Sequence, residues 1–328
     1  MKTIREILPV SGKKVFVRVD FNVPVAGGVI TDDFRIHKSL HTIRFLRENG
    51  AHIILASHFE GEGGSLLPVA EYLKKYFPIT FVENYFPQAG RMISNALEDG
   101  SIVLLQNVRK YAEEKGNDPE FAKVLASYAD MYINEAFSSS HRAHASIVGI
   151  PAVLPSFAGF VFEQEVVELS KVLHPNHPFV FVLGGAKFET KIPLIEKFHS
   201  LADTVFIGGA LANDFLKAAG FNTGTSLLSS SEVDVRRFMT DKLIMPVDVL
   251  VQNGEGVVVK DVSDITDADC VVDVGPKTLG LVAQKISSAT CVLWNGPLGN
   301  YELGFKKGTL ALAQSIADSG AISIVGGG

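Results

Sequence analysis

The feature of this sequence that most limits its fold is the regular alternation of short β-branched runs with longer stretches of helical period. The runs are 15–19, 53–56, 102–105, 131–134, 179–183, 204–207, 248–251, 291–294 and 322–325. Because such runs are apolar on both faces and are separated by helical segments, they predict parallel sheets joined by right-handed crossovers. The predicted fold class is α/β, with doubly wound, mainly parallel sheets.

Residues 150–178 interrupt this alternation. They contain Pro151 and Pro155, a Glu-rich helical stretch at 163–172, and a second proline-rich turn at 174–178. A chain of 328 residues also has the length of about two domains. We therefore expect one domain over 1–152, an interdomain helix and hinge over 153–178, and a second domain over 179–328.

Composition excludes several classes of protein. Hydrophobic residues make up 47% and charged residues 20%, and the net charge is −6, so a nucleic acid is not expected as a partner. Glu6 stands where a secretory apolar stretch would begin, and the apolar segment 152–162 is broken by Pro155 and Gly159. We expect neither a signal peptide nor a membrane span, and the two isolated cysteines fit a cytoplasmic protein.

Polar and cationic side chains follow the predicted strands of the first half. They are Asp20, Asn22, His58, Asn107, Arg109 and Asn134, with Arg35 and Arg142 in nearby segments. The carboxyl ends of parallel strands meet at one edge of a sheet, where ligands bind. Several guanidinium groups with a histidine and amides suit a small, multiply charged anion such as a phosphorylated carboxylic acid.

Glycine clusters follow the predicted strands of the second half. They are Gly184-Gly185-Ala186-Lys187, Gly208-Gly209-Ala210, Asn295-Gly296-Pro297-Leu298-Gly299 and Gly326-Gly327-Gly328. Glycine lets a backbone approach a phosphate, and free amide N–H groups at helix N-termini bind it. A single Gly-Gly pair is better explained by a tight turn. Several clusters in one half, with Lys187 and then Lys191 a helical turn later, favour a nucleotide-binding domain.

The standard nucleotide and metal signatures are missing from the sequence. There is no G-x-x-x-x-G-K-[ST] motif and no predicted strand followed by G-x-G-x-x-G, which argues against a P-loop NTPase and an ordinary dinucleotide dehydrogenase. His141 and His144 are spaced to share a metal, but no third ligand stands nearby. We predict no metal-ligating residue.

Taken in order, the motifs of both halves resemble those of phosphoglycerate kinases, from the N-terminus to the last residue. In the first half the resemblance rests on 18–24, 30–36, 107–109 and 141–146. In the second half it rests on 183–187, 245–248, 273–278 and 294–299. It implies two Rossmann-like domains, the first binding phosphoglycerate and the second binding the nucleotide.

The resemblance also implies the activity, transfer of a phosphoryl group between 1,3-bisphosphoglycerate and ADP to give 3-phosphoglycerate and ATP with Mg²⁺. The chain would be a glycolytic phosphotransferase with a carboxyl group as acceptor, a cytoplasmic monomer without nucleic-acid or membrane partners. The positions matching phosphoglycerate contacts are Asp20, Asn22, Arg35, His58, Arg109 and Arg142. Those matching nucleotide contacts are Lys187, Lys191, Gly208, Gly209, Asn295, Glu302, Gly326, Gly327 and Gly328. Arg35 and Lys187 are the predicted catalytic pair, acting after hinge closure.

Three departures from the family pattern matter. The family continues the glycine run with an acid that serves magnesium, whereas this sequence ends at Gly328, so we expect either a fragment or a natively short protein. After His58 the family has Gly-Arg-Pro, whereas this chain has a short loop with Glu60 and Glu62, which would repel a phosphorylated acid. Ala210 replaces a glycine of the adenine pocket.

Two alternatives remain open from the sequence. The departures are compatible with a noncatalytic protein that binds phosphoglycerate or a nucleotide on the same scaffold. An NAD-dependent oxidoreductase would require the Gly208-Gly209 turn to bind pyrophosphate.

Overall fold

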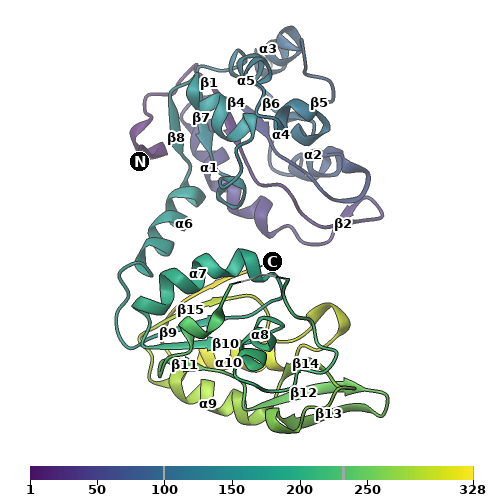
Figure 1. The fold of residues 1–328 in the computed structure, drawn as a ribbon. Coiled ribbons are helices and arrows are strands. Elements are labelled where there is room, and N and C mark those ends of the chain that lie inside the picture. Colours follow the sequence, from purple (N-terminus) through teal and green to yellow (C-terminus); the bar gives the residue numbers. More distant parts are fainter. Residues whose placement is uncertain (99, 231–232, 328) are drawn as a thin grey trace. The chain divides into compact units, whose positions relative to one another are not determined.

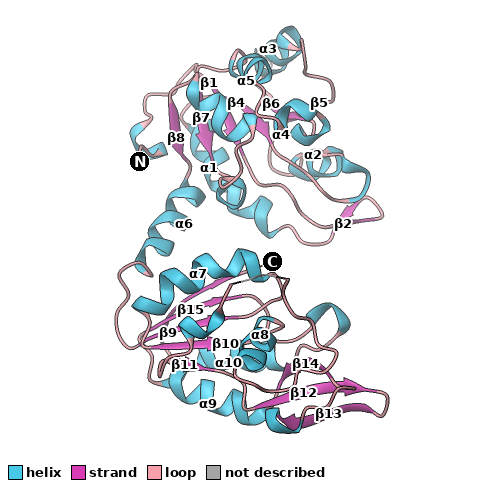
Figure 2. Cartoon of the chain, viewed as in Figure 1, coloured by secondary structure: helices cyan, strands magenta, loops and turns pink. Residues whose placement is uncertain are grey.

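The computed structural model describes residues 1–98, 100–230 and 233–327. The chain divides into two compact units, Met1–Val167 and Glu168–Gly328, each with its own sheets and cores (Figure 1, Figure 2). Each unit is an α/β structure built on a parallel sheet, which confirms the predicted fold class. No helix in the described ranges has both the length and the apolar character needed to cross a membrane.

The first unit contains a six-stranded parallel sheet of order β5-β6-β4-β1-β7-β8. Its strands are β1 Lys14–Arg18, β4 His52–Ala56, β5 Ile79–Val82, β6 Ile102–Leu105, β7 Met131–Asn134 and β8 Ser156–Ala158. A two-stranded hairpin, β2 Val25–Ala26 with β3 Val29–Ile30, lies outside this sheet. The sequence predicted four of the six strands and missed the two at the edges, β5 and β8.

Successive residues of these strands face opposite sides of the sheet, which creates two hydrophobic cores. Val15 and Val17 pack with α1 and α2 in one core, whereas Phe16 packs with α3 and α5 in the other. The helices of this unit are α1 Phe34–Glu48, α2 Leu67–Leu73, α3 Gly90–Glu98, α4 Ala112–Lys115, α5 Pro119–Ala126 and the start of α6 Phe160–Lys171.

The buried carboxylate of Glu135 holds the first turn of α6. It accepts hydrogen bonds from the hydroxyl of Thr42 and from the backbone N–H groups of Val161 and Phe162. Burial raises the pKa of Glu135 to about 7, although these hydrogen bonds act in the opposite direction. Gly159 leaves space for this carboxylate, because a Cβ there would collide with Glu135 Oε2.

The second unit contains a five-stranded parallel sheet of order β11-β10-β9-β15-β16. Its strands are β9 Phe179–Leu183, β10 Thr204–Ile207, β11 Leu243–Ile244, β15 Cys291–Asn295 and β16 Ile322–Gly326. Phe181 and Leu183 face α7 Phe188–Leu201 and α8 Leu211–Ala218, whereas Val180 and Val182 face α9 Pro276–Ser287 and α10 Lys307–Asp318. This sheet is again covered by helices on both faces.

One predicted strand lies in a different sheet from the one expected. The run at 248–251 belongs to β12 Asp248–Asn253, which pairs antiparallel with both β13 Gly256–Asp261 and β14 Cys270–Val274. The parallel prediction is therefore wrong for this run. A tight turn at Gly254 joins β12 to β13. A connection this short between two strands permits only antiparallel pairing.

The register of each parallel sheet brings its strand ends together. In the first unit Arg18 lies opposite Ala56 on one side and Asn134 on the other. In the second unit Asn295 lies opposite Leu183 and Gly326. The segments after these residues therefore form one cluster in each unit, as expected for parallel sheets.

Candidate functional site

At the carboxyl end of β1, hydrogen bonds to Asp20 and Asn22 hold the side chain of Arg35 in place. Its Nη1 donates to Asp20 Oδ2 at 3.0 Å and to the carbonyl oxygen of Asn22 at 3.1 Å. Ser138 donates to the same Asp20 oxygen at 2.5 Å. Burial raises the pKa of Asp20, but the Ser138 hydrogen bond and the charge of Arg35 outweigh it, so the pKa lies below its ordinary value. Asp20 is therefore an anion that orients the guanidinium group from the start of α1.

A second arginine, Arg18, ends the same strand, and the sequence analysis did not assign it to the site. Arg18 is fully buried at the end of β1. It donates from Nε to Ser146 Oγ at 2.9 Å and from Nη1 to the carbonyl oxygen of Val19 at 2.5 Å. The signal that could have found it was a cation inside an apolar strand, since a buried charge requires partners.

His58 is a neutral acceptor in this cluster. Its Nδ1 lies 3.2 Å from Nη2 of Arg18, which can only donate, so the ring proton resides on Nε2. Burial and the adjacent Arg18 charge lower the pKa of His58 to about 3. The histidine therefore offers an N–H donor but no positive charge at neutral pH.

A buried carboxylate compensates the charge of Arg18. Glu114 accepts hydrogen bonds from the backbone N–H of Ser146 at 2.8 Å and from its hydroxyl at 2.6 Å. That hydroxyl is also the acceptor for Arg18 Nε. His144, for which a metal role was considered, lies with Nδ1 3.8 Å from Glu114 Oε1. This nitrogen is buried and has no hydrogen-bond partner among the described residues, so His144 borders the network without being bonded into it.

Arg109 and Arg142 meet at the carboxylate of Glu60. Arg109 pairs through Nη1 with Glu60 Oε1, and Arg142 Nη1 lies 4.0 Å from the same oxygen. The backbone N–H of Glu60 donates to Asn22 Oδ1 at 2.8 Å. The structure therefore joins Asn22, Arg109 and Arg142 through a residue that the sequence analysis identified only as a repulsive charge.

The glycine clusters of the second unit form a network of backbone contacts. The N–H groups of Gly184 and Gly185 donate to the carbonyl oxygens of Asn295 and Pro297, both at 2.8 Å, and that of Gly209 donates to Leu298 at 3.1 Å. The expectation that these glycine amides are free for phosphate is therefore wrong. The strand ends approach so closely that their own polar groups satisfy one another.

Two glycines of this network leave no room for a side chain. A Cβ on Gly209, whose φ is +63°, would lie 2.5 Å from the backbone nitrogen of Gly185. Gly296 has a φ of +88°, and its Cβ would lie 2.6 Å from the carbonyl oxygen of Gly184. Glycine is required here for close backbone packing and for left-handed conformations.

Next to this network lies a cavity of about 660 Å³, a size that suits a nucleoside. Lys187, Lys191, Gly209, Glu302 and Gly327 line it, as does Ala210. Lys191 donates to the side chain of Asn295, and its partial burial lowers its pKa. Gly208 and Gly326 are absent from the lining and lie in the supporting strand ends, and Gly328 falls outside the described residues.

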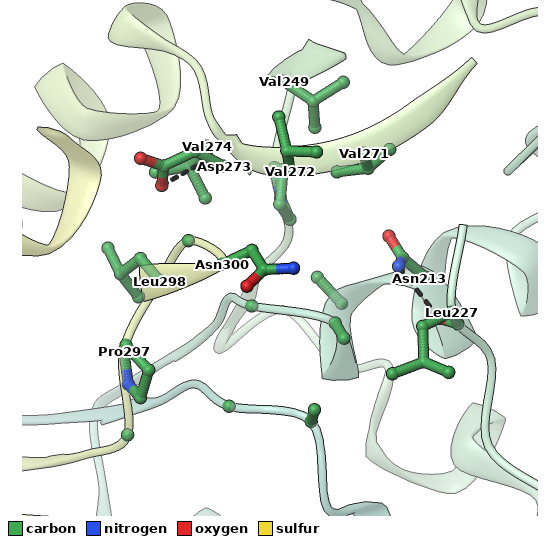
Figure 3. Close-up of a pocket in the computed structure, with 18 of the residues that line it drawn as sticks. Asn213, Leu227, Val249, Val271, Val272, Asp273, Val274, Pro297, Leu298 and Asn300 are labelled. Atoms are coloured by element: carbon green, nitrogen blue, oxygen red, sulfur yellow. Dashed lines mark hydrogen bonds between the residues drawn. The ribbon is translucent and has the colours of Figure 1, made fainter. Parts of the chain in front are cut away.

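The cavity also contains residues that the sequence analysis did not single out. Its walls are largely apolar, with Val249, Val271 and Leu298 among them, and Asn213 and Asn300 face the open centre from opposite sides (Figure 3). Asn213 is 1% exposed and donates to the carbonyl oxygen of Leu227 at 3.0 Å, while its Oδ1 has no partner in the described part of the chain. An unpartnered acceptor in an apolar wall is suited to an amino group of a bound base. No strand-end motif marks Asn213, because it lies inside α8.

The described residues do not form a magnesium site of their own. Nowhere in the described ranges do three His, Cys, Asp or Glu side chains come together as ligands. Asp273, at the cavity, accepts from the N–H of Gly308 at 2.9 Å, and its pKa is raised by burial. Its carboxylate therefore serves the packing of α10.

Fold and site together define a class of α/β proteins with two parallel-sheet units, one carrying an arginine cluster and the other a glycine-framed cavity at its strand ends. Residues 4–328 match the family model described as phosphoglycerate kinase. Among curated relatives, the phosphoglycerate kinase of Rubrobacter xylanophilus is 42% identical over all of this chain and 88% of its own length. That of Dictyoglomus turgidum is 40% identical over 97% of this chain and 85% of its own length. The chain belongs to the phosphoglycerate kinase family.

Solved structures agree with this assignment. The phosphoglycerate kinase from Coxiella burnetii matches 99% of this chain and 88% of its own with a TM-score of 0.85 at 35% identity. That from Pyrococcus horikoshii matches 100% of this chain and 89% of its own with a TM-score of 0.83 at 28% identity. The family predicted from the motifs is confirmed, and the noncatalytic and oxidoreductase alternatives are not favoured.

Proposed function

We propose that this protein transfers a phosphoryl group between 1,3-bisphosphoglycerate and ADP, giving 3-phosphoglycerate and ATP. One observation carries the proposal beyond family membership: the predicted acid-binding residues Asn22, Arg109 and Arg142 meet at a single glutamate. Guanidinium groups that share one internal carboxylate are placed to share the anionic group of a ligand.

In this proposal the first unit binds the phosphorylated acid. Arg109, Arg142 and neutral His58 contact its anionic groups, and Asp20 and Asn22 orient Arg35. Arg109 Nε and Nη2 support this role, because both are buried and neither has a hydrogen-bond partner among the described residues. Unsatisfied buried donors favour an incoming acceptor.

The second unit then binds the nucleotide. Its base occupies the apolar part of the cavity, Glu302 accepts a hydrogen bond from the ribose, and Lys187 and Lys191 neutralise the phosphates. We assign Asn295 to holding Lys191, on the basis of their hydrogen bond. Gly208, Gly209, Gly326 and Gly327 act as the backbone frame of this site.

The chemistry requires positioning and charge neutralisation. An oxygen of the ADP β-phosphate attacks the phosphorus of the acyl phosphate, the bond from phosphorus to the carboxyl oxygen breaks, and 3-phosphoglycerate leaves as a carboxylate. No proton has to move in this step. Arg35 and Lys187 stabilise the charge on the transferring group, which in such reactions supplies most of the catalysis.

Transfer requires the two ligands to meet, and Arg35 and Lys187 belong to different units. We therefore propose that residues 1–152 act as the acid-binding domain, 179–328 as the nucleotide domain, and 153–178 as the hinge between them. Closure would also exclude water, which otherwise hydrolyses the acyl phosphate.

Magnesium is expected to enter with the nucleotide, since it is usually held by phosphates with few protein ligands. The step above assigns no residue to it, because the described residues offer no metal-ligand cluster. A monomeric state and a cytoplasmic location complete the proposal, and the two isolated free cysteines support the second of these. Light scattering of the purified protein tests the first of these.

The decisive experiment is a coupled assay with magnesium, ADP and 1,3-bisphosphoglycerate. We expect formation of ATP, and formation of ADP when 3-phosphoglycerate and ATP are supplied. Calorimetric titration with 3-phosphoglycerate and with ADP runs in parallel. A folded chain that binds both ligands without turnover would support the noncatalytic alternative, whereas binding of NADH without ADP would support an oxidoreductase.

A further inference from the structure

Glu60 lies where its carboxylate can control access to the arginine cluster. It follows β4 by a few residues, pairs with Arg109, and lies 4.0 Å from Arg142. Its backbone N–H donates to Asn22 at 2.8 Å. Glu60 is thus the residue through which three of the proposed acid-binding side chains are connected.

The two members of the Glu60–Arg109 pair differ in exposure. The side chain of Arg109 is 5% exposed, whereas that of Glu60 is 58% exposed. The arginine is therefore enclosed by protein, and the glutamate covers it from the solvent side. Of the two, only the glutamate can leave the pair without opening the fold.

Charge explains why Glu60 occupies this position when no ligand is bound. Burial and the neighbouring Arg142 charge lower the pKa of Arg109, and Glu60 acts in the opposite direction. Arg109 Nε and Nη2 have no partner in the described ranges, so Glu60 is its direct counter-ion there, with a smaller contribution from the buried Glu114.

Hydrogen bonds hold the backbone next to Glu60, whereas ion pairs alone hold its side chain. Asn107 accepts a hydrogen bond from the N–H of Phe59 at 3.1 Å and donates to the carbonyl oxygen of Phe59 at 2.8 Å. Among the described residues, the carboxylate of Glu60 forms ion pairs with the two guanidinium groups and no other polar contact. Rotation about its side-chain bonds can therefore move the carboxylate into water without moving the loop.

We propose that Glu60 is a displaceable internal counter-ion, which occupies the anion position at Arg109 and Arg142 in the free protein and yields it to the phosphorylated acid. This inference rests on the proposed function. Glu60 then sets the affinity of the site for the acid, because a ligand must displace its carboxylate. Monoanions and weak dianions are therefore excluded more strongly than a multiply charged phosphorylated acid.

The inference predicts two linked effects of Glu60→Gln. Affinity for 3-phosphoglycerate rises about tenfold, because the ligand no longer competes with a charge. The melting temperature of the free protein falls while the increase caused by 3-phosphoglycerate becomes larger, because the ligand now supplies the counter-ion. The KM for ADP stays within about twofold of the parent.

The matched control is Glu83→Gln. Glu83 is an exposed glutamate paired at 3.9 Å with Lys110, the residue after Arg109. Its substitution removes the same charge from the neighbouring pair and should leave acid affinity unchanged. Glu60→Asp is a second, conservative variant, whose shorter side chain holds Arg109 less closely and should give an intermediate gain.

Calorimetry and thermal unfolding with 3-phosphoglycerate, and separately with inorganic phosphate, decide the matter. Tighter binding by Glu60→Gln, and not by Glu83→Gln, supports the inference. Unchanged or weaker binding overturns it, since weaker binding would mean that Glu60 positions Arg109 for the ligand. If the parent neither binds 3-phosphoglycerate nor turns over, the proposed function fails, and the inorganic phosphate titrations still test the displacement.

Discussion

The two candidate sites occupy the same place in their units, at the carboxyl ends of a parallel sheet, yet they are built from different parts of the chain. In the first unit the site consists of the ends of long charged side chains, such as Arg35 and Arg109, held by hydrogen bonds. In the second unit the frame consists of backbone, with Gly185 and Gly209 in left-handed conformations. The first site depends on the balance of charges between side chains, and the second depends on close packing of the backbone.

This difference determines how each site responds to change. A charged side chain needs a counter-ion in the free state, so the arginine cluster carries its own carboxylates, Asp20, Glu60 and Glu114. A backbone frame has no such requirement, but it tolerates no added atoms. Substitutions in the first unit should therefore alter function, whereas substitutions in the glycine frame should alter stability first.

The largest effect at neutral pH is expected for Gly184→Ala. A Cβ at Gly184 would collide with the carbonyl oxygen of Pro297, and backbone cannot move aside as a side chain can. We expect a loss of about 3 kcal/mol in unfolding free energy, measured by chemical denaturation. Gly280→Ala is the control, because Gly280 lies in α9 with open space at its Cβ position. It should be stabilising by about 0.5–1 kcal/mol. Equal effects of the two variants would contradict the steric account.

The next effect concerns the protonation of His58. Its pKa is about 3 in the folded protein against 6.5 ordinarily, so the unfolded chain binds more protons below pH 6.5. The stability from this group is complete above pH 6.5 and is lost as the pH falls from 6.5 towards 3, at up to about 1.4 kcal/mol per pH unit. His58→Gln keeps an acceptor for Arg18 but does not titrate, so its stability should depend less on pH in this range.

Glu135 affects the pH dependence of the unfolding free energy in the opposite direction to His58. Its pKa is raised to about 7, so the folded protein binds more protons than the unfolded chain between pH 4.5 and 7. Its contribution therefore increases as the pH falls through 7 and is complete below 4.5. Both the parent and His58→Gln contain Glu135. The difference between their unfolding free energies, measured by urea titration at the same pH, therefore cancels the contribution of Glu135. Identical pH profiles of the two proteins would rule out a buried neutral His58.

A smaller effect, on turnover, separates the two sites. Arg35→Ala should lower turnover at least about tenfold, or roughly 1.4 kcal/mol of transition-state stabilisation, and leave nucleotide affinity nearly intact. Lys191→Ala should raise the KM for ADP by a similar factor and leave the KM for the acid unchanged. Arg44→Ala, on the same helix as Arg35, is the control. Loss of nucleotide affinity in Arg35→Ala would contradict its assignment to the acid.

The smallest effect is expected at Ala210, where the family has glycine. Ala210 has an ordinary helical conformation, with φ at −61°, and lines the cavity through a single methyl group. Ala210→Gly should change the KM for ADP by less than about threefold in steady-state assays. A change of about tenfold or more would show that this methyl group contacts the base.

The sequence predicted the main parallel sheet of each unit because apolar runs are local signals, and residues at the strand ends indicated where each candidate site would lie. Asp20 and Asn22 could be grouped from the sequence alone, since both follow β1, whereas Arg35 joins them from the start of α1. Fold class and family are confirmed. The domain limits and the roles of the site residues stay predictions, which the variants above address.

Other features could not be predicted because they depend on contacts distant in sequence. Arg18 and Glu114 are linked through Ser146, and Asn213 reaches the cavity from within a helix. The antiparallel pairing of β12 depends on a turn that follows the predicted run. Glycine identity indicates close approach, but it does not say whether the partner is a ligand or another part of the chain.

The backbone contacts among the glycine loops at 184–185, 208–209 and 296 have a practical consequence for redesign. Because the glycine loops pack against one another through their backbones, no single position in the floor of the proposed nucleotide cavity can be changed independently of the others. To alter cosubstrate preference, substitutions would have to be made at the rim side chains Ala210, Leu227 and Leu303. Each of these borders the cavity without taking part in the contacts between glycine loops.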